Sequence, residues 1–156
     1  MTAELATVLA DYRTGLDAEL QVLSALEDTA IRQRALPHRA SAEELSTLAD
    51  IRQQQLSALS GLEQQLLPLR ERINAHLDAV RHLPGFAGIA DRHRRMQDLI
   101  ASITRLDDES LEVLRQADQE RRAAAQSLET GEATLAAYRR LLQQPQPSAG
   151  LFTQRG

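Results

Sequence analysis

The sequence contains no cysteine, no tryptophan and no lysine, and aromatic residues make up only 3% of its 156 residues. Without cysteine the chain can form no disulfide, no thiolate metal site and no cysteine nucleophile. The few aromatic side chains are Tyr12, Phe86, Tyr138 and Phe152. Enzyme domains usually bury more large rings in their cores and pockets. Leucine and alanine carry the apolar packing instead, a composition typical of long helices and coiled coils.

Long apolar runs are missing as well. No stretch approaches the roughly 20 apolar residues that a membrane-spanning helix needs, and Met1 to Glu4 lack the basic and apolar blocks of a secretory signal. The net charge is −4, and the acidic residues are interleaved with arginines along the chain. A nucleic-acid binder would more often gather basic residues on one face. We therefore expect a cytoplasmic protein that neither inserts into a membrane nor binds nucleic acid.

Proline and glycine divide the chain into three helical segments. The first helix is expected at about 2–34 and ends before Pro37. The second, at about 41–83, begins with the capping-box pattern of Ser41 and Glu44. The third, at about 89–143, contains no proline and a single glycine, Gly131, and its apolar residues recur every three or four positions.

These segments predict an all-α fold in which residues 1–143 form an elongated antiparallel three-helix bundle or coiled coil. The prolines and glycine of residues 144–156 predict a flexible C-terminal tail. Pro68 predicts a kink in the second helix near residues 64–67, and the alternative is a break into two helices at Pro68. In the first helix, Gly15 costs about 1 kcal/mol relative to alanine. Leu66 and Leu99 lie in the middle of their seams and are expected to be core residues.

Residues able to carry chemistry do not gather in the sequence. The four histidines, at positions 38, 76, 82 and 93, include no pair four residues apart that could hold a metal on one helix face. The consecutive acids Asp107, Asp108 and Glu109 point in different directions around a helix. We expect no catalytic residue, no cofactor and no metal. The basic cluster Arg92 to Arg95 is predicted to be a hydrated patch paired with Asp91 and Asp98, although it could hold a phosphate or an acidic partner segment.

Three stretches carry a family resemblance. The segment from Ile103 to Arg139, with Gly131 followed by Tyr138, resembles the long C-terminal helix of the FlgN/FliT-type flagellar export chaperones. The leucine-rich stretch from Leu16 to Leu66 is similar to their opening hairpin, and Leu151 to Gly156 is similar to their short aromatic, basic ending. Where this family often has asparagine, the chain has Asp107 and Asp108. The resemblance implies a cytoplasmic chaperone that binds C-terminal segments of hook-filament junction proteins and releases them at the export gate.

A client helix bound in this way would be recognised through apolar anchors one or two turns apart. The residues that we predict to bind the partner are Leu128, Leu135, Tyr138, Leu141 and Leu142. The alternative is that these side chains seal the intramolecular bundle. A rival function is a structural coiled-coil scaffold whose third helix self-associates, so the chain is expected to be a monomer or a homodimer.

Overall fold

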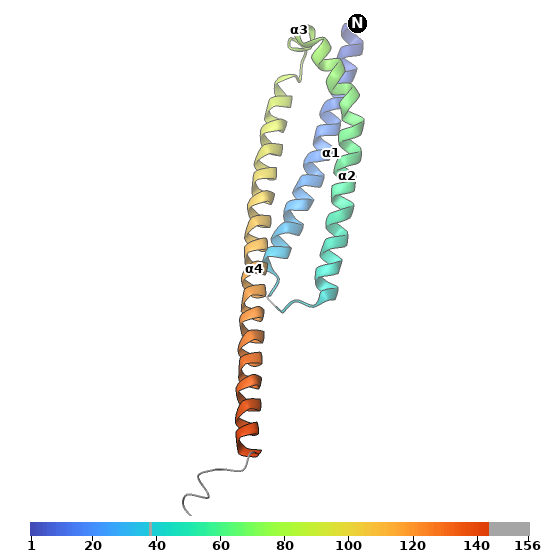
Figure 1. Ribbon diagram of the computed structural model, residues 1–156. Helices are drawn as coiled ribbons and strands as arrows, with labels where there is room; N and C mark the ends of the chain where they lie inside the picture. The colour runs from blue at the N-terminus through green and yellow to red at the C-terminus, as the bar shows by residue number, and fades with distance from the viewer. Residues whose placement is uncertain (38, 144–156) are drawn as a thin grey trace, which may run out of the picture. The chain divides into compact units, whose positions relative to one another are not determined.

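The computed structural model describes residues 1–37 and 39–143, and most of these residues are helical, with no β-strand among them (Figure 1). The helices are α1 (Thr2–Ala35), α2 (Ala42–Ala75), α3 (Leu77–Val80) and α4 (Ala87–Gln143). The chain divides into two units, residues 1–113 and residues 114–156. The predicted all-α class is confirmed. The predicted tail, residues 144–156, lies outside the described residues.

Residues 1–113 form a bundle in which consecutive long helices run in opposite directions (Figure 1). Arg72, near the end of α2, forms an ion pair with Glu4 at the start of α1, so these two helices are antiparallel. The first part of α4 runs parallel to α1, because Asp17 pairs with Arg92 and, further along both helices, Arg34 pairs with Glu109.

The core of this unit lies along one face of α1. Its buried apolar residues recur at the three-four spacing of one helix face: Leu5, Leu9, Tyr12, Leu16, Leu20, Leu23 and Ala30. Towards the start of α1 this face packs with Leu66, Ile73, Val80 and Ile89. Towards its end, Leu23 and Leu26 pack with Ile103 of α4.

The start of α2 forms as its sequence predicts. The Ser41 hydroxyl accepts a hydrogen bond from the backbone N–H of Glu44 at 3.1 Å, and the Glu44 carboxylate accepts one from the backbone N–H of Ser41 at 3.1 Å. Together these two bonds complete the capping box.

The second predicted helix differs from the structure at its end. α2 continues through Pro68 and ends at Ala75, so there is no break at the proline. The backbone leaves the helical conformation at His76, with φ −126° and ψ 34°, and the single turn of α3 follows. Val80 in this turn is fully buried in the core cluster that contains Leu5 and Ile73. The helix expected at 41–83 is thus divided at His76 and not at Pro68. The turn that follows this break places Val80 in the core.

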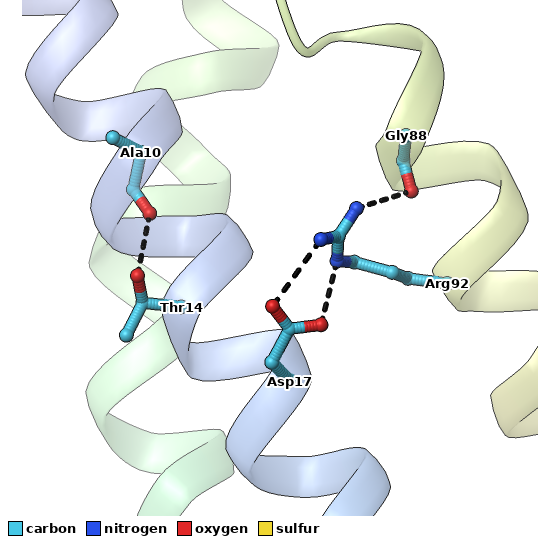
Figure 2. A network of polar contacts seen from close by, with 5 residues as sticks. All are labelled: Ala10, Thr14, Asp17, Gly88 and Arg92. Atoms are coloured by element: carbon cyan, nitrogen blue, oxygen red, sulfur yellow. Dashed lines mark hydrogen bonds and ion pairs between the residues drawn. The ribbon is translucent and has the colours of Figure 1, made fainter.

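Arg92, near the start of α4, forms an ion pair with Asp17 of α1 (Figure 2). Its Nε and Nη2 atoms donate to the two carboxylate oxygens of Asp17 at 2.7 and 3.2 Å, while Nη1 donates to the carbonyl oxygen of Gly88 at 3.0 Å. The hydrogen bond from Arg92 lowers the pKa of the Asp17 carboxyl below its usual range. Of the predicted basic patch, Arg94 does pair with Asp91, at 3.6 Å, whereas Arg92 pairs across helices instead.

Candidate functional site

Residues 114–143 are the helical part of the second unit and carry an exposed apolar surface. Every residue from Asp118 to Leu135 is exposed. Polar side chains within this stretch make local contacts. Arg122 pairs with Asp118 one turn away at 3.1 Å, and the Thr130 hydroxyl donates to the carbonyl oxygen of Gln126 at 2.9 Å. Pairs of this kind contribute only about 0.2–0.5 kcal/mol each to a helix.

All five residues that we predict to bind a partner lie on this stretch. Their exposed fractions range from 57% to 71%, and we call them the apolar stripe: Leu128, Leu135, Tyr138, Leu141 and Leu142. Leu128, Leu135 and Leu142 are seven residues apart and so share one helix face, which Tyr138 joins three residues after Leu135. Leu141 lies at the edge of this face. The stripe is therefore open to solvent in the described chain.

Small residues lie between the leucines on the same face. They recur at seven-residue spacing, at Ala117, Ala124 and Gly131. Ala124 and Gly131 each lie four positions before a leucine of the stripe. A β-carbon added to Gly131 would meet no other atom within 4 Å. A glycine inside a helix costs about 1 kcal/mol relative to alanine, and here no neighbouring atom of the described chain requires it. A glycine on an open face permits another backbone to approach closely.

The exposed apolar stripe is the kind of surface to which a partner protein binds. Contiguous exposed apolar patches mark protein interaction sites, and fully burying one leucine contributes roughly 1.5–3 kcal/mol. The heptad spacing of the stripe matches the anchors of a second amphipathic helix, which would contact it every one or two turns. The geometry is thus suited to binding a helix.

A second group of residues was not predicted from the sequence. The Tyr12 hydroxyl accepts a hydrogen bond from Nε of Arg70 at 3.1 Å and lies 3.2 Å from Nε2 of His93. Arg70 also donates to Glu63 at 2.6 Å, and this bond raises the pKa of Arg70 further above its usual value. These side chains come from α1, α2 and α4. They join the three helices at one level, and Tyr12, Arg70 and His93 border a cavity of about 320 Å³ that Phe86 helps to line.

The burial of Glu19 was also not predicted, although its position in the sequence indicates it. It lies three residues after Leu16 and four before Leu23, and therefore on the apolar face of α1. Its side chain is only 1% exposed. Burial, with a further contribution from the Glu63 carboxylate, raises the pKa of Glu19 to about 7.

The part of the chain that the structure describes contains no group of three or more His, Asp or Glu side chains that could hold a metal ion. Within the same residues, no helix has the length and apolar character needed to cross a bilayer. Comparisons of the chain with family models, curated proteins and solved structures find no match.

Proposed function

We propose that this protein is a client-binding chaperone of the flagellar export type, acting in the cytoplasm. Its apolar stripe would hold an amphipathic segment of a hook-filament junction protein until that protein is exported. The observation that carries this proposal is the stripe itself: five large apolar side chains, each more than half exposed, at helical spacing on one segment. The resemblance of the sequence to FlgN/FliT-type chaperones supplies the class of client.

The stripe has the features that recognition of a helical client requires. A few buried anchors usually carry most of the free energy of an interface, and the leucines at seven-residue spacing provide them. Only part of the gain from burying these side chains would become affinity, because the client loses conformational freedom when it binds. A complex held by so few anchors would be reversible, as a chaperone that must release its client requires.

Charged residues beside the stripe would set the orientation of the client. Glu132 and Arg139 are seven residues apart and follow directly after the positions of Gly131 and Tyr138. Opposite charges in such flanking positions select the partner and its direction in coiled coils. A client helix with a basic residue near Glu132 and an acidic residue near Arg139 would therefore be favoured.

The second candidate function is a self-associating scaffold. The alternation of leucine with Ala117, Ala124 and Gly131 is also suited to pairing with a second copy of the same helix. The two functions differ in stoichiometry, because a chaperone is free to bind its client as a monomer, whereas a scaffold should form a stable oligomer alone.

Sedimentation equilibrium of the full chain, followed by calorimetric titration with C-terminal peptides of hook-filament junction proteins, tests the proposal. We expect the wild-type protein to bind such a peptide and the double variant Tyr138→Ser/Leu142→Ser to bind it at least tenfold more weakly. Leu67→Ser is the matched control, since Leu67 is a comparably exposed leucine on α2. A stable oligomer that the double variant dissociates, without peptide binding, would replace the chaperone with the scaffold. Equal binding by wild type and double variant would remove the stripe from the site.

A further inference from the structure

Glu19 is the most deeply buried acidic side chain of the bundle, and no cation forms an ion pair with it among the described residues. When protonated, its carboxyl shares a hydrogen bond with the Glu63 carboxylate. When it is ionised, neither of its oxygens has a hydrogen-bond donor among the described residues. Buried carboxylates in proteins are nearly always paired or hydrogen-bonded. The nearby cation, Arg70, is already engaged by Glu63 and Tyr12. The carboxylate of Glu19 therefore has the capacity to accept a donor from outside the chain.

Glu19 also lines a cleft of about 350 Å³ between the helices of the first unit. The remaining lining residues are mostly apolar: Leu23, Leu56, Leu59, Ser60, Glu63, Met96 and Ile100. Leu56 and Ile100 are 40% and 50% exposed and so give the cleft an apolar rim open to solvent. The cleft thus combines apolar walls with two carboxylates, of which Glu63 pairs with Arg70 and Glu19 has no cationic partner.

We infer that this cleft binds an arginine side chain presented by a partner polypeptide, with its guanidinium on Glu19 and Glu63 and its methylene stem on the apolar walls. A guanidinium is planar, donates two parallel hydrogen bonds to a carboxylate, and is less strongly hydrated than an ammonium group. It is therefore the cation that is least costly to bury beside Glu19. The exposed rim residues Leu56 and Ile100 would contact apolar neighbours of that arginine on the partner.

The volume of the cleft and its two carboxylates agree with an arginine side chain as the occupant. Its volume lies at the lower end of the roughly 300–1,000 Å³ of ligand pockets, which suits one long side chain rather than a whole helix. Two carboxylates alone fall short of the ligand sets of protein metal sites. The site lies within residues 1–113 and does not depend on the apolar stripe, so it goes beyond the proposed function.

Binding at this site should be linked to a proton. The titratable and charged groups around Glu19 are Glu63 and Arg70 from α2 and, facing Glu63, His93 from α4. Because burial raises the pKa of Glu19 to about 7, the free site is mostly protonated at pH 6 and mostly ionised at pH 8. Since a guanidinium binds the ionised form, its affinity should be about tenfold higher at pH 8 than at pH 6.

The test uses the full chain labelled with ¹³C at its methionine methyl groups. The chain has only two methionines, and of these Met96 lines the cleft while Met1 is exposed at the N-terminus. The probe is a blocked alanine–leucine helical peptide with one central arginine, and its control carries the neutral isostere citrulline. We expect the arginine peptide to shift the Met96 signal saturably, with about tenfold tighter binding at pH 8 than at pH 6, and the citrulline peptide to bind at least tenfold more weakly.

Two variants complete the experiment. Glu19→Gln keeps the shape of the side chain without its charge and should lose at least tenfold in affinity together with the pH dependence. Glu71→Gln, at an exposed position of α2, is the matched control and should bind as wild type does. Should Glu19→Gln fail to fold, the comparison of arginine with citrulline on wild-type protein decides alone. Equal binding of the two peptides, an unmoved Met96 signal, or undiminished binding by a folded Glu19→Gln protein would each overturn the inference.

The double variant Tyr138→Ser/Leu142→Ser should bind the arginine peptide normally. The outcome at the cleft is thereby kept separate from the outcome at the stripe.

Discussion

Leu66 of α2 occupies the space above Gly15 of α1, where its Cδ2 atom lies only 2.1 Å from the position that a β-carbon on Gly15 would take. Leu66 is itself buried in the core cluster that includes Leu16. The glycine that weakens α1 as an isolated helix is therefore the residue that lets α2 approach it closely.

Replacing Gly15 with alanine should destabilise the bundle by about 1–3 kcal/mol, because the added methyl group would overpack the contact with Leu66. Gly61→Ala is the matched control, since a β-carbon there meets nothing within 4 Å. That substitution should stabilise α2 by roughly 0.5–1 kcal/mol. Urea unfolding of the three proteins checks both signs. A Gly15→Ala protein as stable as Gly61→Ala would show that the two helices do not pack this closely.

Leu66→Ala should cost roughly 2–5 kcal/mol of unfolding free energy, as expected for a leucine that is almost fully buried. Leu99 was expected to be equally central but is only partly buried beside the second core cluster. Leu99→Ala should therefore cost less than Leu66→Ala. Denaturant unfolding measures the two values, and the reverse order would contradict the assignment of the core.

On the apolar stripe, Leu135→Gln should change the unfolding free energy by no more than about 0.5 kcal/mol, because the side chain is exposed and glutamine is a good helix former. The same substitution should weaken binding of the client peptide. Unfolding and calorimetric titration are to be measured on one preparation. A large loss of stability would mean that Leu135 is covered within the protein.

The stability of the bundle should fall as the pH rises from about 4.5 to 7. The pKa of Glu19 is raised from 4.5 to about 7 in the folded chain, so the folded state holds a proton that the unfolded state has already lost over this range. The stabilising contribution is complete below pH 4.5 and is lost as the pH rises through 7. Its size is on the order of 3 kcal/mol.

Urea unfolding between pH 4.5 and 8 of wild type and Glu19→Gln measures this contribution. The glutamine variant should lack the decline. Asp17 and Glu63 have lowered pKa values, so their contributions have the opposite sign and are lost on acidification through those lowered values. These contributions are lost mainly below pH 4.5, outside the measured range, so they do not produce the decline. Parallel curves for the two proteins would refute a raised pKa at Glu19.

The parts of the fold that were predictable from sequence are those that depend on neighbours along the chain. The seam of α1 follows from apolar residues at helical spacing, and the capping box of Ser41 and Glu44 follows from two residues three positions apart. The contact between Tyr12 and His93 joins residues 81 positions apart, so no pattern of neighbouring residues could predict it. The break at His76 is similar, because it accompanies the burial of Val80 among residues of α1 and α2.

The five stripe residues were recognised as a group because they continue one apolar repeat. Their exposure was not predictable, since the same repeat would also suit a buried seam. The acid among the leucines of α1 was visible in the sequence at Glu19, but whether it is paired depends on Arg70, Glu63 and Tyr12, which are brought together by folding.

The buried proton of Glu19 makes unfolding a proton-releasing reaction near pH 6. Each molecule that unfolds there transfers close to one proton to the buffer, because the carboxyl is protonated when folded and ionised when unfolded. The calorimetric heat of unfolding would then include the heat of protonating the buffer. It should differ between a buffer with a large ionisation enthalpy and one with a small ionisation enthalpy, so the protonation state of a single side chain inside the bundle becomes visible in the thermochemistry of the whole domain.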